Sequence, residues 1–242
     1  MLQKSRGIVL HALKFRDNSL IATCYSKEFG RTTIQVNHAY GSGKTAGLAV
    51  YFQPLDILDL VFYKKETSEI SLLKEVAIAI PLSELHFDPV KISISMFVSE
   101  VIYRTVREVE PNSELYEFLE NSIRLLDVMH DGVANFHLIF LIQLTRYLGF
   151  YPANGWSETM PFFDYKNGFF CPSPPSHSFN LDKTSSRRLG MLLGTPFYRS
   201  NEISLNHAQR IQAINDLLCY YNFHLGSPLD FKTLPILIQL FQ

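Results

Sequence analysis

The sequence is poor in cysteine, and the spacing of the few that it has excludes several kinds of site. Cys24, Cys171 and Cys219 are the 3 cysteines among 242 residues, and they form no Cys-x-x-Cys pair. An odd number of widely spaced cysteines argues against a disulfide framework and against zinc held by cysteine pairs. We therefore expect free thiols, a reducing compartment and no bound metal.

Long apolar runs and a surplus of charge are also missing. His11 and Lys14 interrupt the apolar stretch near the start, so it is typical neither of a signal peptide nor of a membrane span, and we expect a cytoplasmic protein without membrane contact. The formal net charge of −1 gives nucleic acid no general attraction. Residues 1–80, however, hold 10 Lys and Arg against 7 Asp and Glu, whereas residues 81–155 hold 5 against 10. A polyanion should therefore meet the first 80 residues first.

Motifs of catalysis are weak or missing, and the sequence contains no Gly-x-Ser-x-Gly. Residues 41–45 (GSGKT) resemble the end of a phosphate-binding loop, but His38 stands where the first glycine of that motif belongs. We interpret the segment as a basic loop. Cys171 and His177 form a local pair that could serve a hydrolase, but they would need a third group.

The first 80 residues predict strands. Five short segments rich in β-branched and aromatic residues are separated by turn signals such as Asp17-Asn18 and Gly30. They cover residues 7–15, 20–26, 32–36, 55–63 and 70–79. Five strands of this length suit an OB-fold or an SH3-like barrel, and strand count does not distinguish the two.

Beyond residue 81 the apolar residues recur at helical spacing. One helix is expected from Asn112 or Ser113 to residue 128, and Ser204 is expected to cap another. The others should cover residues 90–109, 134–148, 183–193, 205–223 and 231–241. Residues 150–180 contain five prolines and predict a structured loop or a small β-excursion. The expected fold class is α+β, with a small five-stranded barrel domain over residues 1–80 and an all-α domain with a loop-rich insertion over residues 81–242.

Cations at strand ends and in loops of the barrel region are the candidate DNA contacts, because Lys and Arg there could neutralise phosphates. Phe15, Tyr40 and Phe62 are candidate rings for stacking on bases. The candidate cations are Lys4, Arg6, Lys14, Arg16, Arg31, Lys44, Lys64 and Lys65.

In order along the chain, several segments resemble those of the recombination mediators of the RecO family. The opening GIVLHALKFRDNSLIATCYSKEFGRTTIQV is similar to the first strands of that family, and residues 99–126 to its first helical hairpin. Leu148-Gly149-Phe150-Tyr151-Pro152 and His224-Leu225-Gly226 are similar to two later segments. The likeness covers almost the whole chain and depends on the ordered set of segments.

The resemblance implies an OB-fold, a helical bundle and a bacterial, nucleoid-associated protein of the cytoplasm that has no catalytic residues and no cofactor. It implies binding to single- and double-stranded DNA and annealing of complementary strands. It also implies that the protein works with RecR to help load RecA onto DNA coated by single-strand-binding protein, whose acidic C-terminal tail the family recognises. Arg124 and Arg146 are the expected contacts for that tail.

The chain departs from the family pattern in residues 150–180. Many members carry two Cys-x-x-Cys pairs there, whereas this chain has Cys171 alone, which predicts no zinc. Its loop after the third strand is also less basic than usual, which predicts modest, salt-dependent DNA affinity. Aromatic residues are expected to supply the packing that a metal would provide: Trp156, Phe162, Phe163, Tyr165, Phe169 and Phe170.

Two other hypotheses stay open at this point. The neutral total charge and the acidic middle segment favour a protein adaptor that meets DNA only through RecR and single-strand-binding protein. A hydrolase built on Cys171 and His177 would require a cleft that joins them to a third group.

Overall fold

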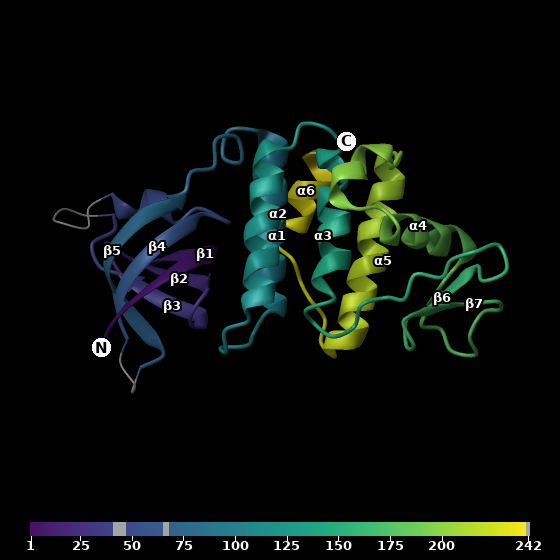
Figure 1. The fold of residues 1–242 in the computed structure, drawn as a ribbon, viewed down its shortest axis with the longest axis horizontal. Coiled ribbons are helices and arrows are strands. Elements are labelled where there is room, and N and C mark those ends of the chain that lie inside the picture. Colours follow the sequence, from purple (N-terminus) through teal and green to yellow (C-terminus); the bar gives the residue numbers. More distant parts are fainter. Residues whose placement is uncertain (41–46, 65–67, 241–242) are drawn as a thin grey trace. The chain divides into compact units, whose positions relative to one another are not determined.

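The computed structural model describes residues 1–40, 47–64 and 68–240, and the chain forms two compact units, Met1–Val128 and Met129–Gln242. The first unit contains strands β1 to β5 and helices α1 and α2, and the second contains the later elements (Figure 1). Two of the candidate cations, Lys44 and Lys65, lie outside the described residues, as do residues 41–45 (GSGKT).

Strands β1 to β5 close a barrel in the order β1-β2-β3-β5-β4. β1 (Leu2–Phe15) pairs with β2 (Ser19–Ser26) through its C-terminal half and with β4 (Ile57–Tyr63) through its N-terminal half. β3 (Gly30–Val36) is antiparallel to β2 and parallel to β5 (Ile70–Ile80), which in turn pairs with β4. This closed five-stranded barrel, followed by a helical region, confirms the predicted OB-type fold.

The barrel interior is apolar because alternate residues of each strand point inward. In β3, buried Thr32, Ile34 and Val36 alternate with half-buried residues. They pack with side chains from the other strands, among them Val9, Leu20, Ala22, Cys24, Leu58, Leu60, Phe62 and Leu73. Each fully buried Leu, Ile or Phe contributes about 1.5–3 kcal/mol to the free energy of folding. The shared apolar core therefore stabilises the closed barrel.

Helices α1 (Pro89–Thr105) and α2 (Ser113–Val128) belong to the same unit as the barrel. The Asp88 side chain caps α1 by accepting the N–H groups of Val90 and Lys91, and the Ser99 hydroxyl donates to the Leu10 carbonyl of β1. Asn112, one of the two expected caps of α2, accepts the Leu115 N–H at 2.9 Å. The predicted end of α1 at residue 109 is wrong: Val106 adopts an extended conformation, and the helix ends at Thr105.

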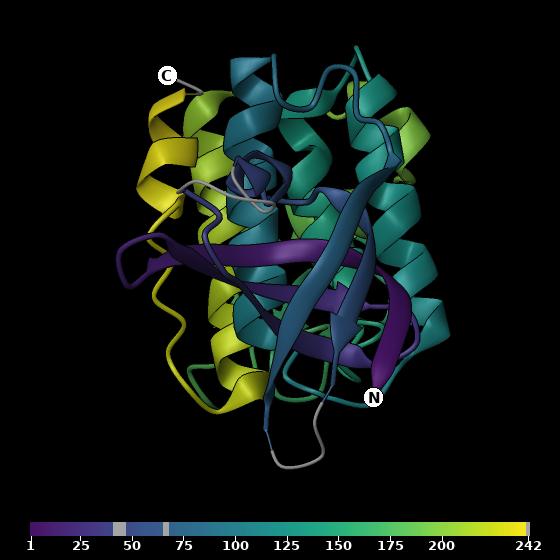
Figure 2. The same ribbon diagram turned by 90° about the vertical axis from the view of Figure 1, so that its left-hand side faces the viewer.

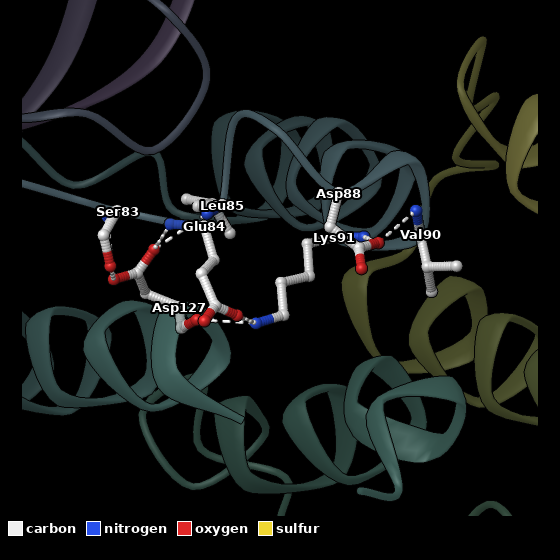
Figure 3. A network of polar contacts seen from close by, with 7 residues as sticks. All are labelled: Ser83, Glu84, Leu85, Asp88, Val90, Lys91 and Asp127. Atoms are coloured by element: carbon white, nitrogen blue, oxygen red, sulfur yellow. Dashed lines mark hydrogen bonds and ion pairs between the residues drawn. The ribbon is translucent and has the colours of Figure 1, made fainter. Parts of the chain in front are cut away.

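The segment that joins the barrel to α1, residues 81–88, is fixed by Asp127 near the end of α2 (Figure 3). The Asp127 carboxylate accepts the N–H groups of Ser83 at 3.1 Å and of Glu84 and Leu85 at 2.8 Å each. Burial alone would raise the pKa of Asp127, but the hydrogen bonds outweigh it and lower that pKa below its ordinary value. The carboxylate thus stays charged and satisfies three successive backbone donors.

Lys91 adds a second charge to the same network. Its side chain is 2% exposed, and Nζ donates to Glu84 Oε2 and to the Asp127 carbonyl oxygen, both at 2.6 Å. A buried ammonium requires such partners, because its desolvation is otherwise uncompensated. Lys91 therefore ties α1, the joining segment and the end of α2 together.

The second unit consists of helices and a small sheet. Its helices are α3 (Phe136–Leu144), α4 (Lys183–Leu193), α5 (His207–Leu225) and α6 (Leu234–Leu240), with the short 3-10 helices η2 (Val133–Asn135) and η3 (Phe197–Glu202). Within the loop-rich insertion, β6 (Phe162–Asp164) pairs with β7 (Phe169–Cys171) and β8 (Asn180–Leu181), so the predicted β-excursion is confirmed. Among the described residues, no helix combines the length and the apolar character needed to cross a bilayer.

Three helix boundaries in this unit differ from the prediction. α3 ends at Leu144, four residues early, and turns continue to Gly149, which adopts a left-handed φ of 84°. α5 is capped by Asn206 instead of Ser204, because the Asn206 side chain and Gln209 form a reciprocal capping box. α6 begins at Leu234, which places Pro235 in the first turn, where its missing N–H costs nothing.

Removing the buried charge should destabilise the first unit. Lys91→Met keeps most of the side-chain volume but removes the ammonium that donates to the Asp127 carbonyl and to Glu84. We therefore expect the free energy of unfolding to fall by about 1–3 kcal/mol. Urea unfolding followed by circular dichroism measures this loss. Lys74→Met is the control, because Lys74 forms an exposed pair with Glu75 and should cost less than about 1 kcal/mol. Equal losses in the two variants would contradict the proposed role of Lys91.

The joining segment should also make stability depend on pH through His86. Its Nε2 lies 2.8 Å from Asp56 Oδ1; this hydrogen bond raises the pKa of His86, with burial opposing and Asp56 and Asp127 adding charge attraction. A histidine whose pKa is higher in the folded than in the unfolded protein stabilises the fold at pH values below the unfolded pKa. This stabilisation is lost as the pH rises through the folded pKa. His86→Ala should therefore lower the free energy of unfolding more at pH 5.5 than at pH 8, two pH values on either side of the ordinary histidine pKa of about 6.5. The same gap in His130→Ala, an exposed histidine, would contradict this assignment.

Candidate nucleic-acid interface

The turn between β1 and β2 presents two candidate cations beside aromatic rings. Arg16 adopts a left-handed φ of 54°, and its guanidinium lies 5.1 Å from the centroid of the Phe15 ring. Lys14 Nζ lies 5.8 Å from the centroid of the Tyr40 ring, and the Tyr40 N–H donates to the Asn18 carbonyl at 3.1 Å. Tyr40 is 48% exposed. The turn therefore holds positive charge and one accessible ring in the same place.

A second group of cations lies near the start of β1 and the end of β4. Lys4 is exposed, and Lys64 Nζ lies 4.8 Å from the centroid of the Phe29 ring. A shallow depression of about 440 Å³ is lined by Lys4, Arg6 and Lys27, and also by the acidic Glu28 and Asp59. Acidic residues thus offset part of the positive charge in this region.

Arg6 illustrates that offset. Its Nε donates to Asp59 Oδ1 at 3.1 Å, with both side chains partly exposed. The hydrogen bond to Asp59 is the main cause that raises the pKa of Arg6 above its ordinary value. A phosphate at Arg6 would have to compete with this carboxylate.

Arg31 occupies a different environment from the other candidates. Its Nη1 donates to the carbonyl oxygens of Tyr103 at 2.5 Å and Val106 at 2.8 Å, at the end of α1. The guanidinium also lies 4.5 Å from the centroid of the Tyr103 ring, and burial lowers the pKa of Arg31. Arg31 therefore joins β3 to α1, and its contact with DNA stays a prediction that competes with this structural role.

The two groups of cations lie far apart on the barrel. β1 runs across it from the N-terminus to the β1–β2 turn (Figure 2). Ten residues separate Lys4 from Lys14, or up to about 33 Å along a strand. A ligand that touches both groups must be extended.

Of the rings expected to stack on bases, one is ruled out by its position. Phe62 points into the barrel and is fully buried, so that expectation is wrong. The next residue, Tyr63, points outward and is 43% exposed. The missed signal is Asp59: strand alternation places this charged, exposed residue on the same face as Tyr63 and on the opposite face from Phe62.

The two expected contacts for an acidic tail lie on different helical segments. Arg124 is exposed on α2. Arg146 follows α3, donates from Nε to Gln143 Oε1 at 2.9 Å and stacks 3.7 Å from the centroid of the Tyr151 ring. Neither observation tests tail binding.

The loop-rich insertion does not fit a zinc ion. The Cys171 thiol donates to the carbonyl oxygens of Phe162 and Ser173, and Asp164 accepts two backbone N–H groups and the Asn167 amide. Across the residues that the structure describes, no three His, Cys, Asp or Glu side chains gather as metal ligands. Burial, aided by Asp164, also raises the pKa of Cys171, which opposes the thiolate that a nucleophile needs.

Aromatic packing fills the insertion instead. The Phe163 ring contacts Tyr165, Phe170 and Tyr220, and the three residues of the insertion are at most 8% exposed. Phe150 and His224 stack at 4.9 Å with an interplanar angle of 3°. Phe169 is 47% exposed, so only part of the expected set is buried.

Comparison with known proteins places the chain in a family. Models of the N- and C-terminal regions of recombination protein O match residues 1–81 and 86–232. DNA repair protein RecO of Flavobacterium psychrophilum is 35% identical, with 98% of each chain covered. The RecO proteins of Phocaeicola vulgatus and Bacteroides fragilis are 34% and 33% identical over the full length of both chains. With an OB-type barrel, a following helical region and matches along nearly its whole length, the chain belongs to the RecO family of DNA repair proteins.

Proposed function

We propose that this protein is a non-enzymatic recombination mediator that binds single- and double-stranded DNA through its barrel and anneals complementary strands. With RecR, it would help load RecA onto DNA coated by single-strand-binding protein, on the nucleoid of the bacterial cytoplasm. The barrel would form the DNA-binding domain, residues 1–80, and residues 81–242 would serve protein contacts. Family membership supports the role in DNA repair.

The β1–β2 turn is the observation that carries this proposal. Lys14 and Arg16 are exposed there, Lys14 beside Tyr40 and Arg16 beside Phe15. Loops that connect strands 1 and 2 are a common ligand surface of OB-folds. Lys4, Arg6 and Lys64 would contact phosphates at the other end of the barrel. Arg31 is the weakest member of the proposed set, because backbone carbonyls already occupy its guanidinium.

A protein adaptor is the second candidate. The acidic segment of residues 81–155 and the pairing of Arg6 with Asp59 favour it. In that case Arg124 and Arg146 would contact the acidic tail of single-strand-binding protein, and DNA contact would be indirect. Persistent binding of a tail peptide, without any annealing of complementary strands, would favour the adaptor.

Replacing the turn cations should weaken DNA binding regardless of sequence. For Lys14→Ala with Arg16→Ala we expect lower affinity and a smaller salt dependence, because each lost phosphate contact removes about 0.7–0.9 from the slope of log K against log salt concentration. Fluorescence anisotropy with a labelled single strand at several salt concentrations measures both quantities.

Lys166→Ala is the matched control, since Lys166 is an exposed cation of the second unit. It should leave affinity and slope unchanged. Binding that cannot be detected even at low salt, or that does not respond to salt, would overturn the electrostatic account. A loss of affinity in the control equal to that in the turn variant would remove the turn from the proposed site.

A further inference from the structure

Six residues in register form a continuous band around the outside of the barrel, here called the belt. Residues paired across neighbouring strands lie side by side on one face. Each belt residue is paired with the next, in the order Leu13, Ile21, Gln35, Leu72, Tyr63 and Leu2. The belt therefore starts on the C-terminal half of β1, crosses β2, β3, β5 and β4, and returns to the N-terminal half of β1.

Five of the six belt residues are apolar, Gln35 being the exception, and four of the five are open to solvent. Leu13, Leu72, Tyr63 and Leu2 are 43%, 39%, 43% and 42% exposed, and Ile21 and Gln35 are half-buried. Ile70, one step from the belt on β5, is also 42% exposed. Scattered exposed apolar residues are ordinary, but a contiguous band of them marks a surface that binds something.

The first unit's own helices leave this band uncovered. Arg31 and its strand partner Tyr25 lie on the row that the end of α1 and the following segment cover, and Tyr25 is 1% exposed. The belt is four residues further along β3, at Gln35. The usual ligand-binding face of an OB-fold lies on strands 2 and 3. Here the end of α1 and the segment after it cover part of that face, so a ligand can reach only the rest.

Cations lie at both ends of the belt. Lys14 follows Leu13, with Arg16 in the adjoining turn, while Lys64 follows Tyr63 and Lys4 is the next outward residue after Leu2. Asp17 and Glu75 are acidic residues nearby, and Glu75 is paired with Lys74 at 3.2 Å. Five steps of about 4.8 Å between strands give a length of about 24 Å. The length of the belt and the cations at its ends match a short stretch of an extended polyanion whose own rings are exposed, such as the bases of a single strand.

We propose that the belt binds the bases of a single DNA strand, with Tyr63 as a stacking platform and the end cations on the phosphates. This inference rests on the proposed function and specifies its face and its form of DNA. Duplex DNA keeps its bases stacked inside and offers phosphates to the cations, whereas a single strand can also lay its bases on an apolar surface. The belt should therefore favour single strands. A protein partner would need the apolar band but not the cations at both ends, so the charges favour nucleic acid.

Tyr63→Ala tests the belt on the full chain. Loss of one stacking platform should weaken binding of an oligothymidylate about fivefold to a hundredfold, while a duplex of equal length should change by about twofold or less. Tyr63→Phe keeps the aromatic ring and should keep the affinity for single strands, which would tie the loss in Tyr63→Ala to stacking. Tyr198→Ala is the control, because Tyr198 is 80% exposed in the second unit. In a second readout, the fluorescence of Tyr63→Trp should be quenched by oligothymidylate and that of Tyr198→Trp should not.

The outcomes separate this inference from the proposed function. If the unaltered chain binds no DNA, the proposed function fails and the belt with it. If the unaltered chain binds DNA but Tyr63→Ala keeps its single-strand affinity, or loses single-strand and duplex affinity equally, only the belt inference is overturned. Unchanged single-strand affinity in Tyr63→Ala together with lost RecR binding would assign the belt to a protein partner instead.

Discussion

The arrangement of the first unit depends on a buried ammonium group, that of Lys91. Charge taken out of water must be compensated on the spot, and Glu84 and the Asp127 carbonyl supply that compensation. Because the two partners belong to the joining segment and to α2, satisfying one cation fixes three parts of the chain. Asp127 completes the arrangement by holding three backbone donors of the same segment.

This anchorage determines which side of the barrel can meet a ligand. With its start held by the joining segment, α1 packs on β1 through Ser99, and its end receives the Arg31 guanidinium of β3. One stretch of the outer barrel surface thereby becomes an internal interface. The remaining surface carries the exposed cations, Tyr40 and the belt, so the DNA-binding surface that we propose lies on the rows that these contacts leave open.

Sequence patterns predict the strands well because alternation and turn residues are local signals, and the ordered resemblance predicts the family. They do not predict the environment of a charge. Lys91 lies in a helical segment whose apolar spacing does not predict that its side chain is buried. Arg31 has the sequence context of an ordinary strand cation, and only the position of α1 shows that its guanidinium is already bound. Phe62 and Tyr63 are adjacent in the strand, and alternation from the charged Asp59 places Tyr63 outside and Phe62 inside. Helix ends fail for a related reason, since side-chain caps such as Asn206 decide them.

Hydrogen–deuterium exchange of the full chain, with and without an excess of a single-stranded oligonucleotide, tests most directly whether the open side of the barrel binds DNA. Amides that a bound strand shields from solvent exchange more slowly. The structure predicts slower exchange in the β1–β2 turn and in the ends of β4 and β5 that carry Tyr63 and Leu72. Slower exchange confined to residues 129–242, or no change in the barrel, would contradict this account.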